Sequence, residues 1–237
     1  MKYKGNARKA ALKIILWSLV AVLVVCGLGA FTVTAAAAIA AVAVAVSPFM
    51  IVLWIVFALF TLYFFRDPEA RPPLGANLVL APGHGKVDMV DHTNEPEFMG
   101  GQCQRISIFL SVIDVHVQNA PVGGTVAFFK YTTGQFLNAL KAASAIHNEN
   151  VLLGFDANDP PGQKIGVRLI AGVLARRIVP FVKAGEEVVR GQRISLIQFG
   201  SRADVYLPAG AQIKVKLGDH VVGGQTILAT FEPSTPA

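Results

Sequence analysis

The sequence predicts a mostly β (α+β) protein, in which a transmembrane helical hairpin at residues 1–65 precedes a β-barrel or β-sandwich domain at residues 66–237. Three observations lead to this fold class. Residues 14–65 contain no Asp, Glu, Lys, Arg or His. After Pro73, short β-rich runs alternate with Gly and Pro, as in all-β domains. A sequence motif that begins at Val182 returns at Val215, which indicates an internal repeat.

The uncharged stretch is long enough for two membrane-spanning helices, because about 20 apolar residues cross a bilayer. We expect the first span near residues 14–32 and the second near 46–65. The Ala-rich stretch 35–46 either extends one helix or forms the turn, and Ser47-Pro48 either kinks or starts the second helix. A signal peptide is excluded by length, since its apolar core runs only about 7–15 residues.

Basic residues flank the uncharged stretch at both ends, which predicts that both ends lie on the cytoplasmic side. We therefore expect a hairpin in the cell (inner) membrane, with the domain on the cytoplasmic side. A single long tilted span is the weaker alternative, and it would place the domain outside. The flanking residues are Lys2, Lys4, Arg8, Lys9 and Lys13 before the stretch, and Arg66 and Arg71 after it.

Composition excludes two broad classes. With 53% hydrophobic and 15% charged residues, the chain is not intrinsically disordered. Its formal charge of +6 would be compatible with a nucleic-acid partner. All 15 acidic residues follow the hairpin, however, so the domain itself is nearly neutral and we expect no nucleic-acid partner. Cys26 lies in the apolar stretch and Cys103 in the domain, so no disulfide framework is implied.

The domain is predicted to consist mainly of short strands separated by turns. The segment 136–146 has helical spacing of apolar residues and is predicted as a helix. The segment 156–162, which reads DANDPPG, is predicted as a loop. The strand-like runs are 78–81, 106–112, 125–131, 167–173 and 194–199.

The repeat places a Gly-acid pair in one turn, a Val on a short strand, and a Gly-Gln pair in a second turn. Its two copies are 182–194 and 215–227. The spacing resembles the lipoyl-like hairpin repeats of lipoyl- and biotinyl-type β-sandwiches, which favours a compact β-barrel module. A carrier domain displays a Lys at a tight turn, and neither copy has one, so we expect no lipoyl or biotin attachment.

Gly200-Ser201 interrupts two strand-like runs, where a turn is less expected. A serine after glycine can attack its own preceding carbonyl when the peptide is strained, because glycine permits unusual backbone angles. β-Elimination from the resulting ester breaks the chain, and the new terminal dehydroalanine hydrolyses to a pyruvoyl group. That carbonyl forms a Schiff base with a substrate amine and serves as an electron sink.

Five motifs in order make the chain resemble the phosphatidylserine decarboxylase proenzyme family, of the short bacterial and archaeal type, over roughly residues 64–210. The N-terminal hairpin also suits that type. The motifs are FFRDP at 64–68 with Pro72, IFLS at 108–111 followed by DVHV at 114–117 and Pro121, GQFLNA at 134–139 with Lys141, Ala142 and Ser144, ARRIV at 175–179, and FGSR at 199–202.

The resemblance implies self-cleavage between Gly200 and Ser201. It would give a β chain, residues 1–200, and an α chain, residues 201–237, which form a heterodimer; whether a higher oligomer forms stays open. The implied cofactor is a covalent pyruvoyl group derived from Ser201, with no metal and no pyridoxal phosphate. The implied reaction converts phosphatidylserine in the membrane to phosphatidylethanolamine and CO2, a step of phospholipid biosynthesis.

His116, in the DVHV motif, is the candidate acid/base, because the pKa of an ordinary histidine side chain, about 6.5, suits proton transfer near neutral pH. A histidine held inside a strand is the alternative. Pro82-Gly83-His84-Gly85 stands where the family usually has Pro-Ala-Asp-Gly, so His84 is a candidate base for cleavage. Asp88, four strand residues further on, would lie about 13 Å from that position. Arg202 and Asp204 are expected to form a structural pair.

Arg176 and Arg177 are candidates for the lipid phosphate, since guanidinium groups suit it; a solvated turn or strand end is the alternative. His92, His147 and His220 are predicted to lie on the surface. A zinc peptidase is disfavoured because no short His spacing is present. The remaining alternative is a catalytically degenerate, uncleaved relative that serves as a membrane-anchored β-barrel module.

Overall fold

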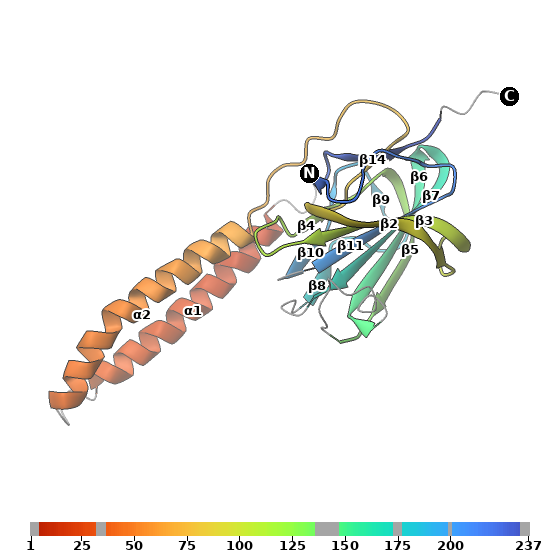
Figure 1. Ribbon diagram of the computed structural model, residues 1–237. Helices are drawn as coiled ribbons and strands as arrows, with labels where there is room; N and C mark the ends of the chain where they lie inside the picture. The colour runs from red at the N-terminus through yellow and green to blue at the C-terminus, as the bar shows by residue number, and fades with distance from the viewer. Residues whose placement is uncertain (1–4, 32–36, 136–146, 173–176, 199–200, 233–237) are drawn as a thin grey trace. The chain divides into compact units, whose positions relative to one another are not determined.

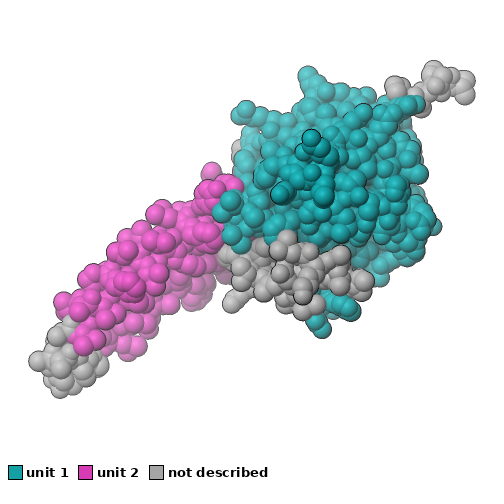
Figure 2. Space-filling view, in the orientation of Figure 1, with its two compact units in different colours: residues 1–4, 68–237 teal, residues 5–67 magenta. Residues whose placement is uncertain are grey.

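The computed structural model describes residues 5–31, 37–135, 147–172, 177–198 and 201–232. The chain divides into two compact units, Gly5–Asp67 and Pro68–Ala237, which Figure 2 shows in different colours. The predicted helix at 136–146 lies outside the described residues.

The first unit consists of two helices, α1 (Asn6–Phe31) and α2 (Ala37–Phe64), and both are long and apolar enough to cross a membrane. Trp54 of α2 donates a hydrogen bond from Nε1 to the Ser18 hydroxyl of α1 at 2.9 Å, which links the helices. The Ala-rich stretch extends α2 from Ala37 onwards, and Pro48 lies inside that helix. The idea that Ser47-Pro48 starts the second helix was therefore wrong.

Many large apolar side chains of this unit are exposed, as expected for surfaces that face lipid rather than water. Examples are Leu23, Leu28, Val44, Phe49 and Leu59.

The second unit is mostly β (Figure 1). Its described part forms one eight-stranded sheet, in the order β13-β2-β3-β11-β7-β6-β5-β9, and two three-stranded sheets, β4-β10-β8 and β1-β14-β12. The strands are β1 (Leu78–Leu80), β2 (Gly85–Glu95), β3 (Gly101–Leu110), β4 (Val117–Asn119), β5 (Gly123–Thr132), β6 (Asn150–Asp159), β7 (Pro161–Ala171), β8 (Arg177–Pro180), β9 (Glu187–Val188), β10 (Arg193–Gln198), β11 (Ser201–Leu207), β12 (Gln212–Ile213), β13 (His220–Val221) and β14 (Ile227–Thr230).

The mostly β prediction is confirmed, and each predicted strand-like run overlaps an observed strand. The predicted loop at 156–162 is wrong. Strands β6 and β7 pair as far as Asn158 and Pro161, so only Pro160 separates them. Pro161 is the first residue of its strand, a position where the missing N–H is tolerated.

One face of the large sheet, here called the inner face, carries the main hydrophobic core. Because strand side chains alternate between faces, Ala203, Val205 and Leu207 of β11 join that core, whereas Arg202 and Asp204 lie on the opposite, outer face. Strand β11 is hydrogen-bonded to β3 on one side and to β7 on the other. It is thus a central strand, held on both edges.

The large sheet is built from two similar halves. The first half is β13-β2-β3-β11 and the second half is β9-β5-β6-β7. In the first, Val221 pairs with Gly85 at the start of β2; in the second, Val188 pairs with Gly124 at the start of β5. Both halves carry a β-bulge two to three residues later, at Val87/Met89 and at Val126/Phe128.

The predicted sequence repeat supplies the edge turns of these halves. The amide of Gly185 donates to the Val126 carbonyl at 2.8 Å, and the amide of Gly218 donates to the Val87 carbonyl at 2.8 Å. Both glycines have positive φ, 86° and 96°, which glycine adopts without strain. The two copies therefore occupy matching places in the halves, in agreement with the predicted paired hairpins.

Candidate active site

Ser201 is the first residue of β11 and is fully buried. It pairs with Leu110, the last residue of β3, and with Ala171, the last residue of β7. Its hydroxyl oxygen is buried, and none of the described residues forms a hydrogen bond with it. A buried hydroxyl without a partner is costly in a folded protein. It is therefore a group that calls for a chemical explanation.

His116 is buried at the place where the chain leaves the large sheet. It lies between β3 and β4, and its carbonyl accepts a hydrogen bond from the Ile197 amide of β10 at 3.1 Å. Strand β10 ends at Gln198, and β11 begins at Ser201. His116 is therefore placed beside the end of the strand that leads to Ser201, while Ser201 pairs with the strand that leads to His116.

The hydrogen bond of the His116 ring defines its tautomer. The Nδ1 atom lies 2.9 Å from the carbonyl oxygen of Asp114. Because a carbonyl oxygen can only accept, Nδ1 carries the proton, and Nε2 is the nitrogen that can take up and return one. The Asp114 carboxylate accepts from the Ser111 amide at 2.8 Å, which holds this loop in a compact turn.

His84 lies directly before β2, which is separated from β11 by β3. Since neighbouring strands are about 4.8 Å apart, the backbones of β2 and β11 are about 10 Å apart. The Nδ1 atom of His84 accepts a hydrogen bond from the Gly223 amide at 3.3 Å. A role of His84 as a base toward Ser201 stays a prediction.

Of the two arginines predicted for the lipid phosphate, Arg176 lies outside the described residues, and Arg177 begins β8 with an exposed side chain. Near Arg177, Glu149 accepts a hydrogen bond from the Ile178 amide at 3.2 Å. Burial, reinforced by a hydrogen bond with Glu149, raises the pKa of Tyr131 to about 12. His92, His147 and His220 are exposed, as predicted.

Next to Ser201, Arg202 joins two carboxylates on the outer face. Its Nε donates to Asp204 at 3.0 Å and its Nη1 donates to Asp88 of β2 at 2.9 Å. The Arg202–Asp204 pair confirms the prediction. Burial raises the pKa of the Asp88 carboxyl; the Arg202 charge opposes that rise, and the Asp204 charge adds to it.

The contact with Asp88 is one that sequence reasoning missed. Asp88 and Arg202 are 114 residues apart, and the sequence gives no sign that a bulge at Val87/Met89 sets Asp88 out of the regular alternation. Only the pairing of β2 with β3 and of β3 with β11 brings the two side chains together.

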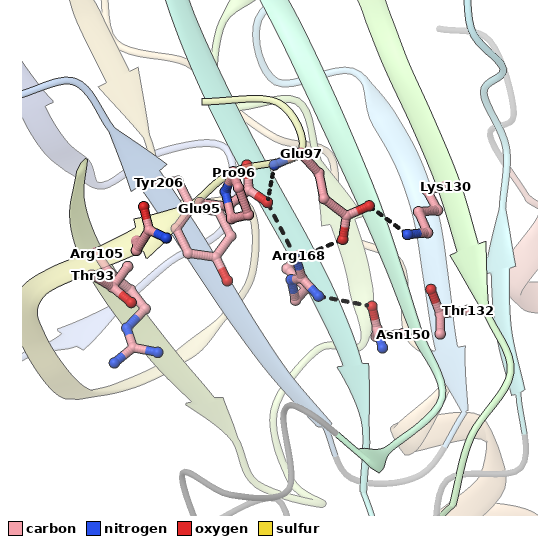
Figure 3. A pocket seen from close by; sticks show the side chains of 11 residues that line it. Thr93, Glu95, Pro96, Glu97, Arg105, Lys130, Thr132, Asn150, Arg168 and Tyr206 are labelled. Carbon is pink, nitrogen blue, oxygen red and sulfur yellow. Dashed lines mark hydrogen bonds and ion pairs between the residues drawn. The ribbon is translucent and has the colours of Figure 1, made fainter. Parts of the chain in front are cut away.

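A polar pocket of about 420 Å³ also lies on the outer face (Figure 3). Arg168 in this pocket donates to Asn150 at 3.3 Å and lies 3.5 Å from Glu95, while Lys130 pairs with Glu97 at 2.5 Å. Tyr206 lines it as well, and burial raises the pKa of that phenol. Neither Ser201, His116 nor His84 lines this pocket, so it is separate from the candidate site.

The fold and the site define a class: β proteins with two candidate membrane-spanning helices and a buried serine as the candidate reactive group. Two helices that can cross a membrane precede the β domain, in which a serine that follows a glycine is buried and has no hydrogen-bond partner among the described residues. A buried histidine lies beside the end of the strand that leads to this serine.

Comparison with known proteins identifies the family. Residues 57–229 match the family model described as phosphatidylserine decarboxylase. The chain is 46% identical over 178 residues to a phosphatidylserine decarboxylase proenzyme of Gluconobacter oxydans, covering 74% of this chain and 78% of that one. It is 44% identical over 171 residues to the proenzyme of Symbiobacterium thermophilum, covering 72% and 79%. With the proenzyme of Nitrosomonas europaea it shares 39% over 203 residues, covering 86% and 90%. The chain therefore belongs to the phosphatidylserine decarboxylase family.

Proposed function

We propose that residues 66–237 form a decarboxylase domain that converts phosphatidylserine to phosphatidylethanolamine and CO2, using a pyruvoyl group made from Ser201. The observation that carries the proposal is the Ser201 hydroxyl, which is buried at the start of a central strand with no hydrogen-bond partner among the described residues. Family membership and the matching names of the relatives support the same reaction.

Self-cleavage follows from the chemistry of this serine. Its Oγ attacks the carbonyl carbon of Gly200, so that a C–O bond forms and the C–N bond breaks. Loss of the Cα proton then expels the Gly200 carboxylate from Cβ, which separates residues 1–200 from 201–237. Water replaces nitrogen at the resulting dehydroalanine, ammonia leaves, and a ketone remains. When formed, this group supplies a carbonyl that accepts electrons as CO2 departs.

His116 is proposed as the proton carrier. The carbon that loses CO2 must take up a proton, and a protonated imidazole can supply it. The Asp114 carbonyl fixes Nδ1 as a donor, so Nε2 is the atom that we assign to this transfer. Arg176 and Arg177 are proposed to bind the lipid phosphate.

The two chains are expected to stay together after cleavage as an α/β heterodimer. Strand β11 pairs with β3 over Ser201–Leu207 and with β7 over Ser201–Tyr206. The later strands β13 and β14 pair with β2 and β1. Residues 201–237 are thus tied to strands on the N-terminal side of the break at several places.

The helices of residues 1–65 are proposed to anchor the domain on the cytoplasmic side of the inner membrane. An anchor suits a lipid substrate, because the head group is presented at the membrane surface. The basic flanks of the helices support this orientation.

Intact-mass analysis of the purified full-length protein in detergent tests the proposal. We expect two fragments, residues 1–200 and 201–237, and the mass of the smaller one should show a pyruvoyl terminus in place of serine. A carbonyl-specific hydrazide should label only that fragment. A chain that stays intact after long incubation would contradict the proposal and favour the degenerate, uncleaved alternative.

A further inference from the structure

Cleavage after Gly200 would turn residue 201 into a chain terminus, and terminal residues tend to fray. Residue 201 itself cannot prevent this through its side chain, because conversion to a pyruvoyl group removes the serine hydroxyl, which already has no hydrogen-bond partner among the described residues before cleavage. Its carbonyl carbon leads directly to Arg202, whose side chain is only 3% exposed. Arg202 is therefore the first side chain that can fix the new terminus.

We propose that Arg202 is a positioning residue, which holds residue 201 in place across the chain break by bridging Asp88 and Asp204. This inference rests on the proposed self-cleavage. Asp88 belongs to the fragment 1–200, whereas Arg202 and Asp204 belong to 201–237. The bond of 2.9 Å from Arg202 Nη1 to Asp88 thus crosses between the two chains, and the bond of 3.0 Å from Nε to Asp204 orients the same guanidinium within its own strand.

The planar guanidinium is suited to this task. It presents several N–H groups in a fixed fork, so that two carboxylates in different strands can be bound at once. Its two partners differ in burial, with Asp204 at 1% and Asp88 at 23% exposure. Since the bonds lie in or near the protein interior, solvent screens them less than it screens a surface pair.

The second half of the sheet shows that the backbone does not require this ion pair. Its bulge at Val126/Phe128 matches the one at Val87/Met89, and Ala127 takes the place of Asp88. Lys164 takes the place of Arg202, since it pairs with Asp156 just as Arg202 pairs with Phe109. Ala127 and Lys164 are both exposed. Among the described residues of the two halves, this bridge is thus found in the half that contains Ser201 and not at the matching positions of the other.

The test uses Asp88→Asn in the full-length protein, with Arg202→Lys as a second variant that keeps the charge and loses the fork. Asp91→Asn is the matched control, because Asp91 lies in the same strand and pairs with Arg105 at 2.6 Å. That pair joins β2 to β3, both within residues 1–200. Fragment masses, kcat, KM for phosphatidylserine vesicles, and amide exchange of residues 202–204 are measured for each protein.

For cleaved Asp88→Asn and Arg202→Lys we expect a kcat lower by about 10- to 100-fold, since a small misplacement of a reacting group has effects of that size. KM should change little, and amide exchange at 202–204 should be faster than in the wild type. Asp88→Glu, which keeps the carboxylate, should recover part of the lost kcat. Asp91→Asn should keep kcat within about twofold, because a partly exposed pair contributes little.

Cleaved Asp88→Asn and Arg202→Lys with wild-type kcat and wild-type exchange would overturn the positioning role and leave the proposed function intact. An uncleaved wild type would overturn the proposed function, and the positioning role with it, since no new terminus would need to be held. If one variant does not fold, the other decides the question with the same measurements.

Discussion

In the second half of the large sheet, β6 and β7 are joined by a turn at Pro160, whereas in the first half the matching strands β3 and β11 are far apart in the sequence. The chain leaves β3 at Leu110, builds the whole second half, and returns through β10 to Ser201. The β6–β7 junction is therefore closed by a hairpin turn, whereas the β3–β11 junction is open, meaning that no turn connects the two strands. Ser201 begins the strand on one side of this open junction, and His116 lies in the segment that follows the strand on the other side.

This difference accounts for the location of the proposed reactive site in only one of two similar halves. The halves share edge pairings and bulges, so their backbones place counterpart residues alike. In the first half, the end of β3 and the start of β11 are not joined by a turn. The peptide before β11 could therefore be cleaved without breaking a hairpin. The residues at those ends, rather than the sheet itself, distinguish the halves.

The largest expected effect is that of a substitution at Ser201, compared with its counterpart in the second half. Ser201→Ala removes the hydroxyl that would attack Gly200, so we expect an intact chain and complete loss of CO2 release. Its counterpart in the second half is Gln163, one residue before Lys164, and Gln163→Ala should leave both cleavage and activity unchanged. Intact mass and release of labelled CO2 are the measurements. Cleavage that survives in Ser201→Ala would show that the break lies elsewhere.

A smaller effect is expected at the other end of the open junction. His116→Asn removes the proposed proton carrier, and the loss of a general acid lowers kcat by about 10²- to 10⁴-fold. His92→Asn is the control, since His92 is an exposed residue of β2 and surface changes have small effects. The kcat of both variants is measured on material that mass spectrometry shows to be cleaved. Equal kcat values for cleaved His116→Asn and wild type would remove His116 from the mechanism.

Matched glycines test whether the two halves are equivalent in packing. A Cβ at Gly85 would lie 2.2 Å from the Phe109 carbonyl oxygen, and one at Gly124 would lie 2.1 Å from that of Asp156. Both positions have positive φ, 155° and 152°. We expect Gly85→Ala and Gly124→Ala each to destabilise the protein by at least about 1–3 kcal/mol, through overpacking and backbone strain.

The rate of self-cleavage should distinguish these two glycine variants. Phe109 pairs with Arg202, so Gly85→Ala should also slow cleavage, whereas Gly124→Ala should affect stability alone. Thermal unfolding in detergent and the rate of fragment formation are compared for the two proteins. Very different losses of stability would show that the halves are alike in topology but not in packing.

Much of the fold could be predicted because it depends on local patterns. The absence of charge across residues 14–65 indicated the helices, and the spacing of Gly-acid and Gly-Gln pairs indicated the edge hairpins. The loop predicted at 156–162 was wrong because its Asp, Asn and Pro residues disfavour strands locally, while pairing with β5 and β7 determines the structure. Tertiary pairing cannot be inferred from composition.

The candidate site could be predicted only in part, for the same reason. The local pattern Gly-Ser at 200–201 and the DVHV motif drew attention to Ser201 and His116. The Arg202–Asp204 pair was expected beside the cleavage site, and two residues at i and i+2 of a strand do lie on the same face. The contact between Asp88 and Arg202 depends on the registers of two strand pairs and on a bulge, and local sequence patterns do not specify these.

The smallest expected effect concerns the charge on Asp88, a position where the second half has Ala127. Burial raises the pKa of this carboxyl above 3.8, so the folded protein retains a proton that the unfolded chain has released. Between the two pKa values the folded state binds more protons, and stability therefore falls as pH rises through this range. Asp88→Asn cannot ionise and should lack this decline.

The melting temperature of Asp88→Asn relative to wild type should thus increase as pH rises from below 3.8 through the raised value, and stay constant above it. Thermal unfolding in detergent over this range is the measurement, with Asp91→Asn as the control. If ionised Asp88 lowers the stability of the fold, and Asp88→Asn nevertheless has a lower kcat, then the role of the Asp88–Arg202 ion pair is in activity and not in stabilising the fold. Buried ion pairs can serve to fix one arrangement rather than to add stability, and the open junction is where one arrangement matters. A relative melting temperature that instead falls with pH would show that the Arg202 bridge stabilises the sheet, as an ordinary strand-to-strand contact does.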